Sequence, residues 1–190
     1  MNVQYPRSPS EATVNTGLIV TQVNGADFGI NLLHTAKGLS SAEVKETAVN
    51  ATWRGISLRL LHPLLCVESK TYNLNTLEQD RPGERRQDRK HLLLSLGNLR
   101  QHLLARSTPA QEASCLRMAR RLVDLAYHQM GLDTLTRHGV DILTGVPWAA
   151  WGEGKLASLR KLVAKETDFR QEIQSRLRAV EDLDAWVQKL

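Results

Sequence analysis

Glu68 and Lys70 are the residues of this 190-residue chain whose types and spacing come closest to a catalytic pair. A Glu-x-Lys that ends a strand, with a second acid upstream, can hold Mg²⁺ through carboxylates while the lysine assists the attacking water. Asp27 or Glu46 would be the upstream acid. Pro63 at the front of the run favours a helix instead of a central strand. On a helix, Glu68 and Lys70 are a solvated pair, and a metal-dependent nuclease stays an alternative function.

A second candidate site is the basic cluster RPGERRQDRKH at residues 81–91. It places Arg85, Arg86, Arg89 and Lys90 where a Pro-Gly loop meets the start of a predicted helix. Such a junction can hold phosphate, because the first N–H groups of a helix lack partners and its end carries partial positive charge. Alternatively, the basic side chains pair with neighbouring carboxylates in a solvated loop. No aromatic residues are interleaved, which argues against a stacking platform for single strands.

Other catalytic and metal-binding patterns are missing from the sequence. The six histidines have no H-E-x-x-H spacing, the two cysteines are not spaced as a metal-ligand pair, and no G-x-S-x-G is present. The GEGK at 152–155 lacks the strand and the Ser/Thr of a phosphate loop, so a turn is predicted. We therefore predict no catalytic residue and no resident cofactor.

The elements that would position these residues change character at Pro63. Before it, an Asn-Gly turn and β-branched runs predict strands, at 16–23, 28–34, 48–53 and 55–61. Ser40 and Glu43 form a capping-box pattern for a short helix over 39–48. Residues 1–12 are polar and rich in Pro and Ser, which predicts a flexible arm.

From Pro63 onward the spacing of apolar residues is helical. Helices are predicted to about Leu77, over 87–106, from the STPAQE segment to Gly131, and near the C-terminus. The second carries a leucine repeat, Leu92, Leu93, Leu96, Leu99, Leu103 and Leu104. The last carries one apolar face, Phe169, Ile173, Leu177, Val180, Leu183 and Val187. Trp148 and Trp151 lie at i and i+3 on a short helix, where core packing is expected.

These segments predict an α+β fold in which a small mixed β-sheet in the N-terminal third is followed by a helical bundle. The predicted division is a 1–12 arm, an α/β part at 13–78 and a helical part at 79–190.

A 42% hydrophobic content is typical of a globular chain. No apolar run is long enough to span a membrane. The two cysteines fit a reducing cytoplasm. A net charge of +5 permits a nucleic-acid or acidic partner.

The stretch GISLRLLHPLLCVESKTYNLNTL, followed by RQDRKHLLL, resembles a known family as a unit. It is similar to the second half of bacterial nucleotidyltransferase-like proteins of the DNA polymerase β superfamily, including those of abortive-infection toxin systems. TRHGVDIL at 136–143 also resembles their helical tail, so the likeness spans about 16–145. The matching positions are Leu61, His62, Pro63, Cys66, Ser69, Lys70, Asn73, Leu74, Gln87, Asp88, Lys90, His91 and Leu92.

The resemblance implies nucleotidyl transfer with two divalent metals held by three carboxylates. Two of these belong to an Asp-x-Asp after Gly-Gly or Gly-Ser, and this sequence has no such motif, as if it began after that place. The third acid is expected in FGINLL, where Asn31 stands. A neutral amide adds no negative charge, so Asn31 is a vestigial metal position. Mg²⁺ is expected only if another chain supplies the catalytic half.

The sequence therefore predicts a degenerate, N-terminally shortened nucleotidyltransferase-like pseudoenzyme, bacterial and related to toxin–antitoxin or phage-defence systems. It would act by binding, as an inhibitor, an antitoxin-like partner or a subunit. A protein partner is expected, and nucleic acid through the 81–91 loop is a further option. The alternatives are a nucleotidyltransferase or nuclease whose missing acids come from another chain, and a basic nucleic-acid-binding protein. The residues predicted to hold phosphate or an acidic partner are Lys70, Arg85, Arg86, Arg89 and Lys90.

Overall fold

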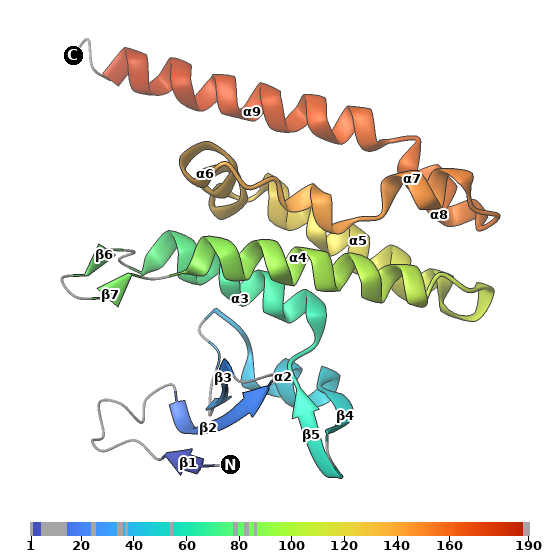
Figure 1. The fold of residues 1–190 in the computed structure, drawn as a ribbon. Helices are drawn as coiled ribbons and strands as arrows, with labels where there is room; N and C mark the ends of the chain where they lie inside the picture. The colour runs from blue at the N-terminus through green and yellow to red at the C-terminus, as the bar shows by residue number, and fades with distance from the viewer. Residues whose placement is uncertain are drawn as a thin grey trace. The chain divides into compact units, whose positions relative to one another are not determined.

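The chain is mostly helical in a computed structural model, with short antiparallel strands in its N-terminal third (Figure 1). The chain forms two compact units, Met1–Leu65 and Cys66–Leu190. The predicted boundaries after residues 12 and 78 stay predictions. The structure describes the backbone of residues 2–4, 15–23, 26–33, 36, 38–53, 55–77, 80–81, 84–85 and 87–187. It describes the side chains at 36, 38–52, 55, 57–77 and 87–179.

The first unit holds two antiparallel sheets joined by a short helix. Strands β1 (Asn2–Gln4), β2 (Asn15–Val23) and β3 (Ala26–Leu33) form one sheet in that order. Strands β4 (Val49–Trp53) and β5 (Ile56–Leu60) form a hairpin. The four predicted strands are confirmed to within about two residues. The predicted sheet was mixed, but every strand pair in the described parts of the chain is antiparallel.

The turns of this unit agree only partly with the sequence prediction. Gly55 turns the β4–β5 hairpin with a φ of 79°, a conformation that glycine adopts without steric cost. The predicted Asn24–Gly25 turn and the 5–12 part of the predicted arm lie outside the described residues. Helix α2 (Ser41–Thr47) begins after Ser40, as predicted, but the Ser40 side chain makes no cap hydrogen bond. The Ser40 side-chain bond of the predicted capping box is therefore wrong.

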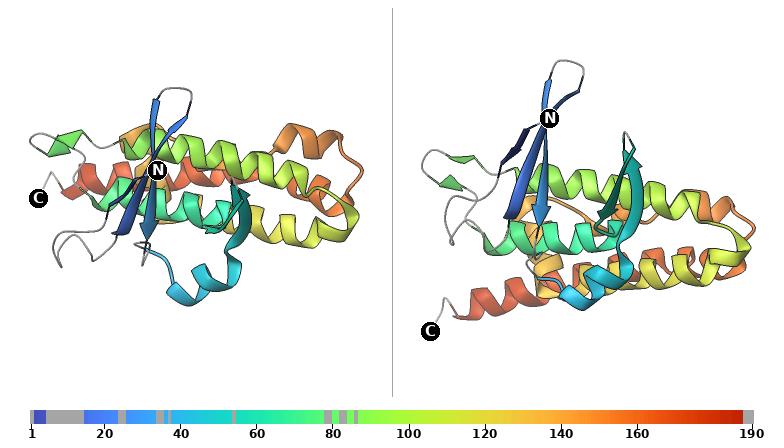
Figure 2. Two further views of the ribbon diagram at one scale, coloured as in Figure 1. Left: turned by 60° about the horizontal axis from the view of Figure 1, so that its bottom comes forward. Right: turned by 90° about the horizontal axis from the view of Figure 1, so that it is seen from below.

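The second unit is a bundle of helices that follows α3 (Pro63–Thr76). A short hairpin, β6 (Asp80–Arg81) and β7 (Glu84–Arg85), leads into α4 (Asp88–Ala105). Figures 1 and 2 show the long helices α4, α5 and α9 running alongside one another. The remaining elements are η1 (Pro109–Gln111), α5 (Glu112–Tyr127), α6 (Gln129–His138), η2 (Ile142–Gly145), α7 (Trp148–Glu153), α8 (Ala157–Val163) and α9 (Glu166–Val187).

The bundle core forms where η2 packs against α4 and α5. Gly145 in η2 is needed there, because a Cβ at this position would lie 2.9 Å from a Leu122 methyl and 3.0 Å from a Leu96 methyl. Both predicted tryptophans, Trp148 and Trp151, are buried, so the expected core packing is confirmed. The side chains that α4 buries in this core are those of Leu92, Leu96, Leu99 and Leu103, at helical spacing.

Two details of the predicted helices are wrong. Leu93 is 44% exposed and does not join the leucine face of α4, because neighbouring residues on a helix point about 100° apart. Gly131 does not end the second long helix. That helix, α5, ends at Tyr127, His128 is extended, and Gly131 lies inside α6. A left-handed glycine does end α6, at Gly139 with a φ of 63°.

Candidate binding site

The residues predicted to contact a phosphate or an acidic partner lie on separate elements. Lys70 is half-buried on α3, while Arg89 and Lys90 are exposed in the first turn of α4. Arg85 belongs to β7, where only the backbone is described, and Arg86 lies outside the described residues. The structure therefore describes only part of the predicted cluster, and its role as one binding surface stays a prediction.

The predicted vestigial metal position lies in the middle of a strand. Asn31 is on β3, directly opposite Leu18 of β2. Its side chain is not among those described, so its role stays a prediction. In the described parts of the chain, no three His, Cys, Asp or Glu side chains are grouped as a metal ion would require.

Arg89 has a structural use that the sequence does not reveal. Its Nε donates a hydrogen bond of 2.9 Å to the carbonyl of His138, the last residue of α6. This bond satisfies a helix-end carbonyl and joins the start of α4 to the end of α6. Partial burial, followed by the charge of Arg137, lowers the pKa of the His138 imidazole; Arg89 lowers it further and Asp133 opposes them.

Glu68 and Lys70 are not arranged as a strand-borne metal site. Both lie on α3, and residues two apart on a helix do not face each other. Arg121 of α5 binds Glu68 with both Nε and Nη2; the second contact measures 2.6 Å between Nη2 and Oε2. A bidentate pair of this kind uses both carboxylate oxygens. The helical interpretation of this segment is confirmed, and Glu68 connects α3 to α5.

A groove of about 570 Å³ lies between α5, α8 and the start of α9. Leu116, Val123, Leu162 and Phe169 contribute apolar surface to it. Val123 and Leu162 are buried, and the other two are half-buried, so a ligand in the groove would meet apolar side chains. A concave volume of this size falls in the usual range for ligand sites.

Three exposed cations line the same groove. Arg120 comes from α5, Lys161 from the last turn of α8, and Lys165 from the junction of α8 with α9. Among the described residues, no carboxylate forms an ion pair with any of them. Asp124 is the acidic residue of the lining. The groove therefore combines apolar surface with an excess of positive charge.

Hydrogen bonds hold the helices on either side of this groove in place. A Glu112 carboxylate oxygen of α5 accepts a 2.6 Å bond from the backbone N–H of Ser158, one of the unpaired donors at the start of α8. Arg176 of α9 donates to the Tyr127 carbonyl at 3.2 Å, and its guanidinium lies 5.0 Å from the centre of the Tyr127 ring. The groove is thus preformed by contacts outside its lining cations.

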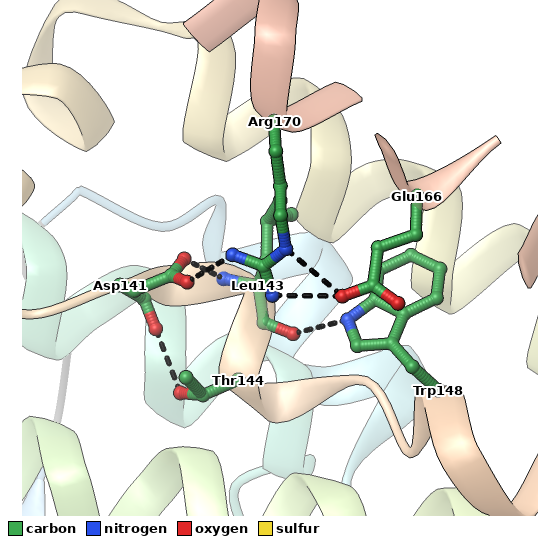
Figure 3. A network of polar contacts seen from close by, with 6 residues as sticks. All are labelled: Asp141, Leu143, Thr144, Trp148, Glu166 and Arg170. Carbon is green, nitrogen blue, oxygen red and sulfur yellow. Dashed lines mark hydrogen bonds and ion pairs between the residues drawn. The ribbon is translucent and has the colours of Figure 1, made fainter. Parts of the chain in front are cut away.

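A second polar network fixes the start of α9 against η2 (Figure 3). Arg170 bonds Asp141 at 2.6 Å and Glu166 at 2.8 Å. Asp141 also accepts a 2.9 Å bond from the Leu143 N–H and so caps η2. The Trp148 indole donates to the Leu143 carbonyl at 2.8 Å. These bonds place the first turns of α9, which form one wall of the groove.

Tyr127 lines the groove but is poorly suited to act as an acid or a nucleophile. Burial is the main cause that raises the pKa of its phenol, and the charge of Glu172 is the second. Asp124 and Asp168 raise this pKa further, and Arg176 lowers it. The rings of Tyr127 and Phe169 pack in a T-shaped arrangement, with ring centres 6.3 Å apart. The Tyr127 side chain therefore stays neutral and contributes packing.

Sequence reasoning missed the groove because its residues come from three segments between 116 and 169. The one local signal is that Lys161 and Lys165 are four residues apart on either side of the apolar Leu162. The packing of α5 against α8, which brings Arg120 to the same place, has no sequence signature. Comparison with family models, curated proteins and solved structures finds no match to the chain.

Proposed function

We propose that the chain is a degenerate nucleotidyltransferase-like protein of the bacterial cytoplasm that acts by binding a negatively charged partner. It serves as an inhibitor, an antitoxin-like partner or a subunit, and it does not transfer nucleotides itself. The observation that carries this proposal is the groove between α5, α8 and α9, with its apolar surface and its cations that form no ion pair with a described residue.

The way the second unit uses its charges supports binding of an anion. Its carboxylates are largely engaged in structure: Glu68 pairs with Arg121, Glu112 caps α8, and Asp141 and Glu166 hold Arg170. Exposed cations such as Lys90 and Lys161 have no such partner among the described residues. An excess of exposed positive charge attracts acidic partners and speeds their association.

The residues that nucleotidyl transfer or nuclease activity would require favour binding without turnover. The resemblance calls for an acid where Asn31 stands, and an amide cannot neutralise a Mg²⁺ ion. Glu68, the acid of the nuclease alternative, is held by Arg121 on a helix. Freeing it for a metal would break this bidentate contact between α3 and α5.

Fluorescence anisotropy tests this function with the purified full chain. The probes are a labelled acidic peptide, a labelled oligonucleotide and a labelled neutral peptide, each titrated at low and at physiological salt. We expect binding to at least one of the acidic probes that weakens as salt rises, and none to the neutral peptide. Absence of binding to both acidic probes would overturn the proposed function.

A further inference from the structure

We infer that the groove between α5, α8 and α9 is a docking site for an acidic amphipathic segment of a partner protein. The inference rests on the proposed function and adds the site and the chemistry of the partner. The segment would place apolar side chains on Leu116 and Phe169 and set its carboxylates beside Arg120, Lys161 and Lys165.

The positions of the cations determine where the carboxylates of the partner would lie. Lys161 lies in the last turn of α8, Lys165 lies at the junction of α8 with α9, and Arg120 lines the same groove from α5. A segment between these walls meets positive charge on both sides. Asp124 lies on α5 one turn after Arg120, so the carboxylates of the segment belong beside the three cations and away from Asp124.

The apolar surface favours a peptide over nucleic acid as the occupant. Nucleic-acid backbones are held by rows of basic and polar donors, and unpaired bases stack on open aromatic faces. Here the apolar lining is mostly aliphatic, and the Tyr127 ring already contacts Arg176 and the Phe169 ring. Apolar pockets at helical spacing are what an amphipathic helix recognises.

The preformed geometry makes the site suitable for binding a flexible segment. The Glu112–Ser158 bond fixes α8, and the Arg170 network fixes α9, without using any of the three groove cations. A rigid site loses little conformational entropy on binding, which leaves the ordering of the peptide as the main cost. Lys161 and Lys165 are exposed and form no ion pair with a described residue, so replacing them should leave the fold intact.

The test compares two double variants of the full chain that each lose two positive charges. Lys161→Gln/Lys165→Gln changes the groove, and Arg100→Gln/Arg137→Gln changes exposed cations of α4 and α6 that do not line the groove, as the control. The probe is a labelled helical peptide with two leucines four residues apart and flanking glutamates. A peptide of the same composition with scrambled order and an oligonucleotide are the competing probes. Circular dichroism and the urea midpoint verify that each variant folds.

We expect the groove variant to weaken binding of the ordered peptide at least about tenfold, and the control variant to weaken it less than about twofold. Leu116→Gln should weaken the ordered peptide and leave the scrambled one unchanged, since only the ordered one presents an apolar face to the groove. Equal losses in both double variants, or equal affinity for both peptides, would overturn the inference. Preference for the oligonucleotide would overturn it and leave the proposed function standing, whereas no binding to any acidic probe would remove both.

Discussion

The Glu68–Arg121 pair shows how a residue that resembles a catalytic acid is used for packing. The Glu68 side chain is 14% exposed and that of Arg121 is 43% exposed, so the pair is only partly shielded from water. Pairs of this kind contribute modestly to stability, and their main effect is to fix the relative position of the two helices. The carboxylate therefore belongs to the α3–α5 contact.

A double-mutant cycle measures this contact. Glu68→Gln, Arg121→Gln and the combined variant should give a coupling free energy of about 0.5–1 kcal/mol in urea unfolding, because the bidentate geometry is only partly shielded. Addition of Mg²⁺ should not change the unfolding midpoint of any of the four proteins. A midpoint that Mg²⁺ raises in the original chain but not in Glu68→Gln would restore the nuclease alternative.

His138 gives a second prediction at the residue scale, on pH. Burial first, and then Arg137, lower the pKa of its imidazole in the folded chain, so the unfolded chain binds the proton more readily. Stability is then full above the ordinary histidine pKa of about 6.5 and decreases as the pH falls below it. Titration of the His138 imidazole by NMR should give a pKa below the ordinary value.

Two substitutions on α4 check the cause of this lowered pKa, Arg89→Gln as the test and Arg100→Gln as the control. Arg89 is one of the charges that lower the pKa of His138, so its removal should move that pKa back toward the ordinary value. Arg100→Gln, on the exposed face of α4, should leave it unchanged. A His138 pKa at or above the ordinary value in the original chain would contradict this account of the α4–α6 junction.

Glycines that look alike in the sequence have opposite roles at the scale of elements. Gly97 lies on the exposed side of α4, and an added Cβ would meet nothing within 4 Å. Gly131 lies in α6, where an added Cβ would overlap the Leu125 carbonyl oxygen and lie 2.7 Å from the Cα of Ala126. The close approach of α5 and α6 therefore depends on the missing side chain at Gly131.

Alanine substitutions at these glycines should change stability in opposite directions. Gly97→Ala should stabilise the chain by about 0.5–1 kcal/mol, because alanine restricts the unfolded chain and favours helix. Gly131→Ala should destabilise it by at least about 2 kcal/mol through overpacking against backbone. Chemical denaturation measures both. Similar effects at the two positions would contradict the packing of α6 against the end of α5.

The junction of η2 with α9 gives a further prediction at this scale. Asp141→Ala removes the cap of η2 and one partner of Arg170, so we expect a loss of about 1–3 kcal/mol in unfolding free energy. Glu172→Gln removes an exposed pair with Arg176 one turn away on α9 and should cost less than about 0.5 kcal/mol. Equal costs would mean that the Asp141 network does not hold α9.

The sequence predicts the elements of this chain better than their contacts. Strand pairs and helices follow from β-branched runs, from Pro63 at a helix start and from leucines at helical spacing, which are local signals. Helical spacing alone excludes Leu93 from the leucine face, whereas the role of Gly131 depends on the neighbouring helix α5. The groove could not be predicted for the same reason, since Arg120 meets Lys161 only after α5 packs against α8.

At the scale of the whole molecule, the chain has an excess of positive charge in both its sequence and its groove. The net charge is +5, and within the described residues no helix is long and apolar enough to cross a membrane. The α+β order of the elements agrees with the predicted layout in outline. The nucleotidyltransferase-like interpretation of residues 16–145 remains a proposal that depends on the sequence resemblance.

Calorimetric titration of the full chain with a nucleoside triphosphate, with and without Mg²⁺, tests the central claim of binding without catalysis most directly. A catalytic site binds the triphosphate through the metal, so Mg²⁺ would strengthen binding there. A basic groove instead attracts the bare triphosphate, and Mg²⁺ would weaken binding by neutralising the ligand. We predict no binding or binding that Mg²⁺ weakens; binding that requires Mg²⁺ would contradict the account.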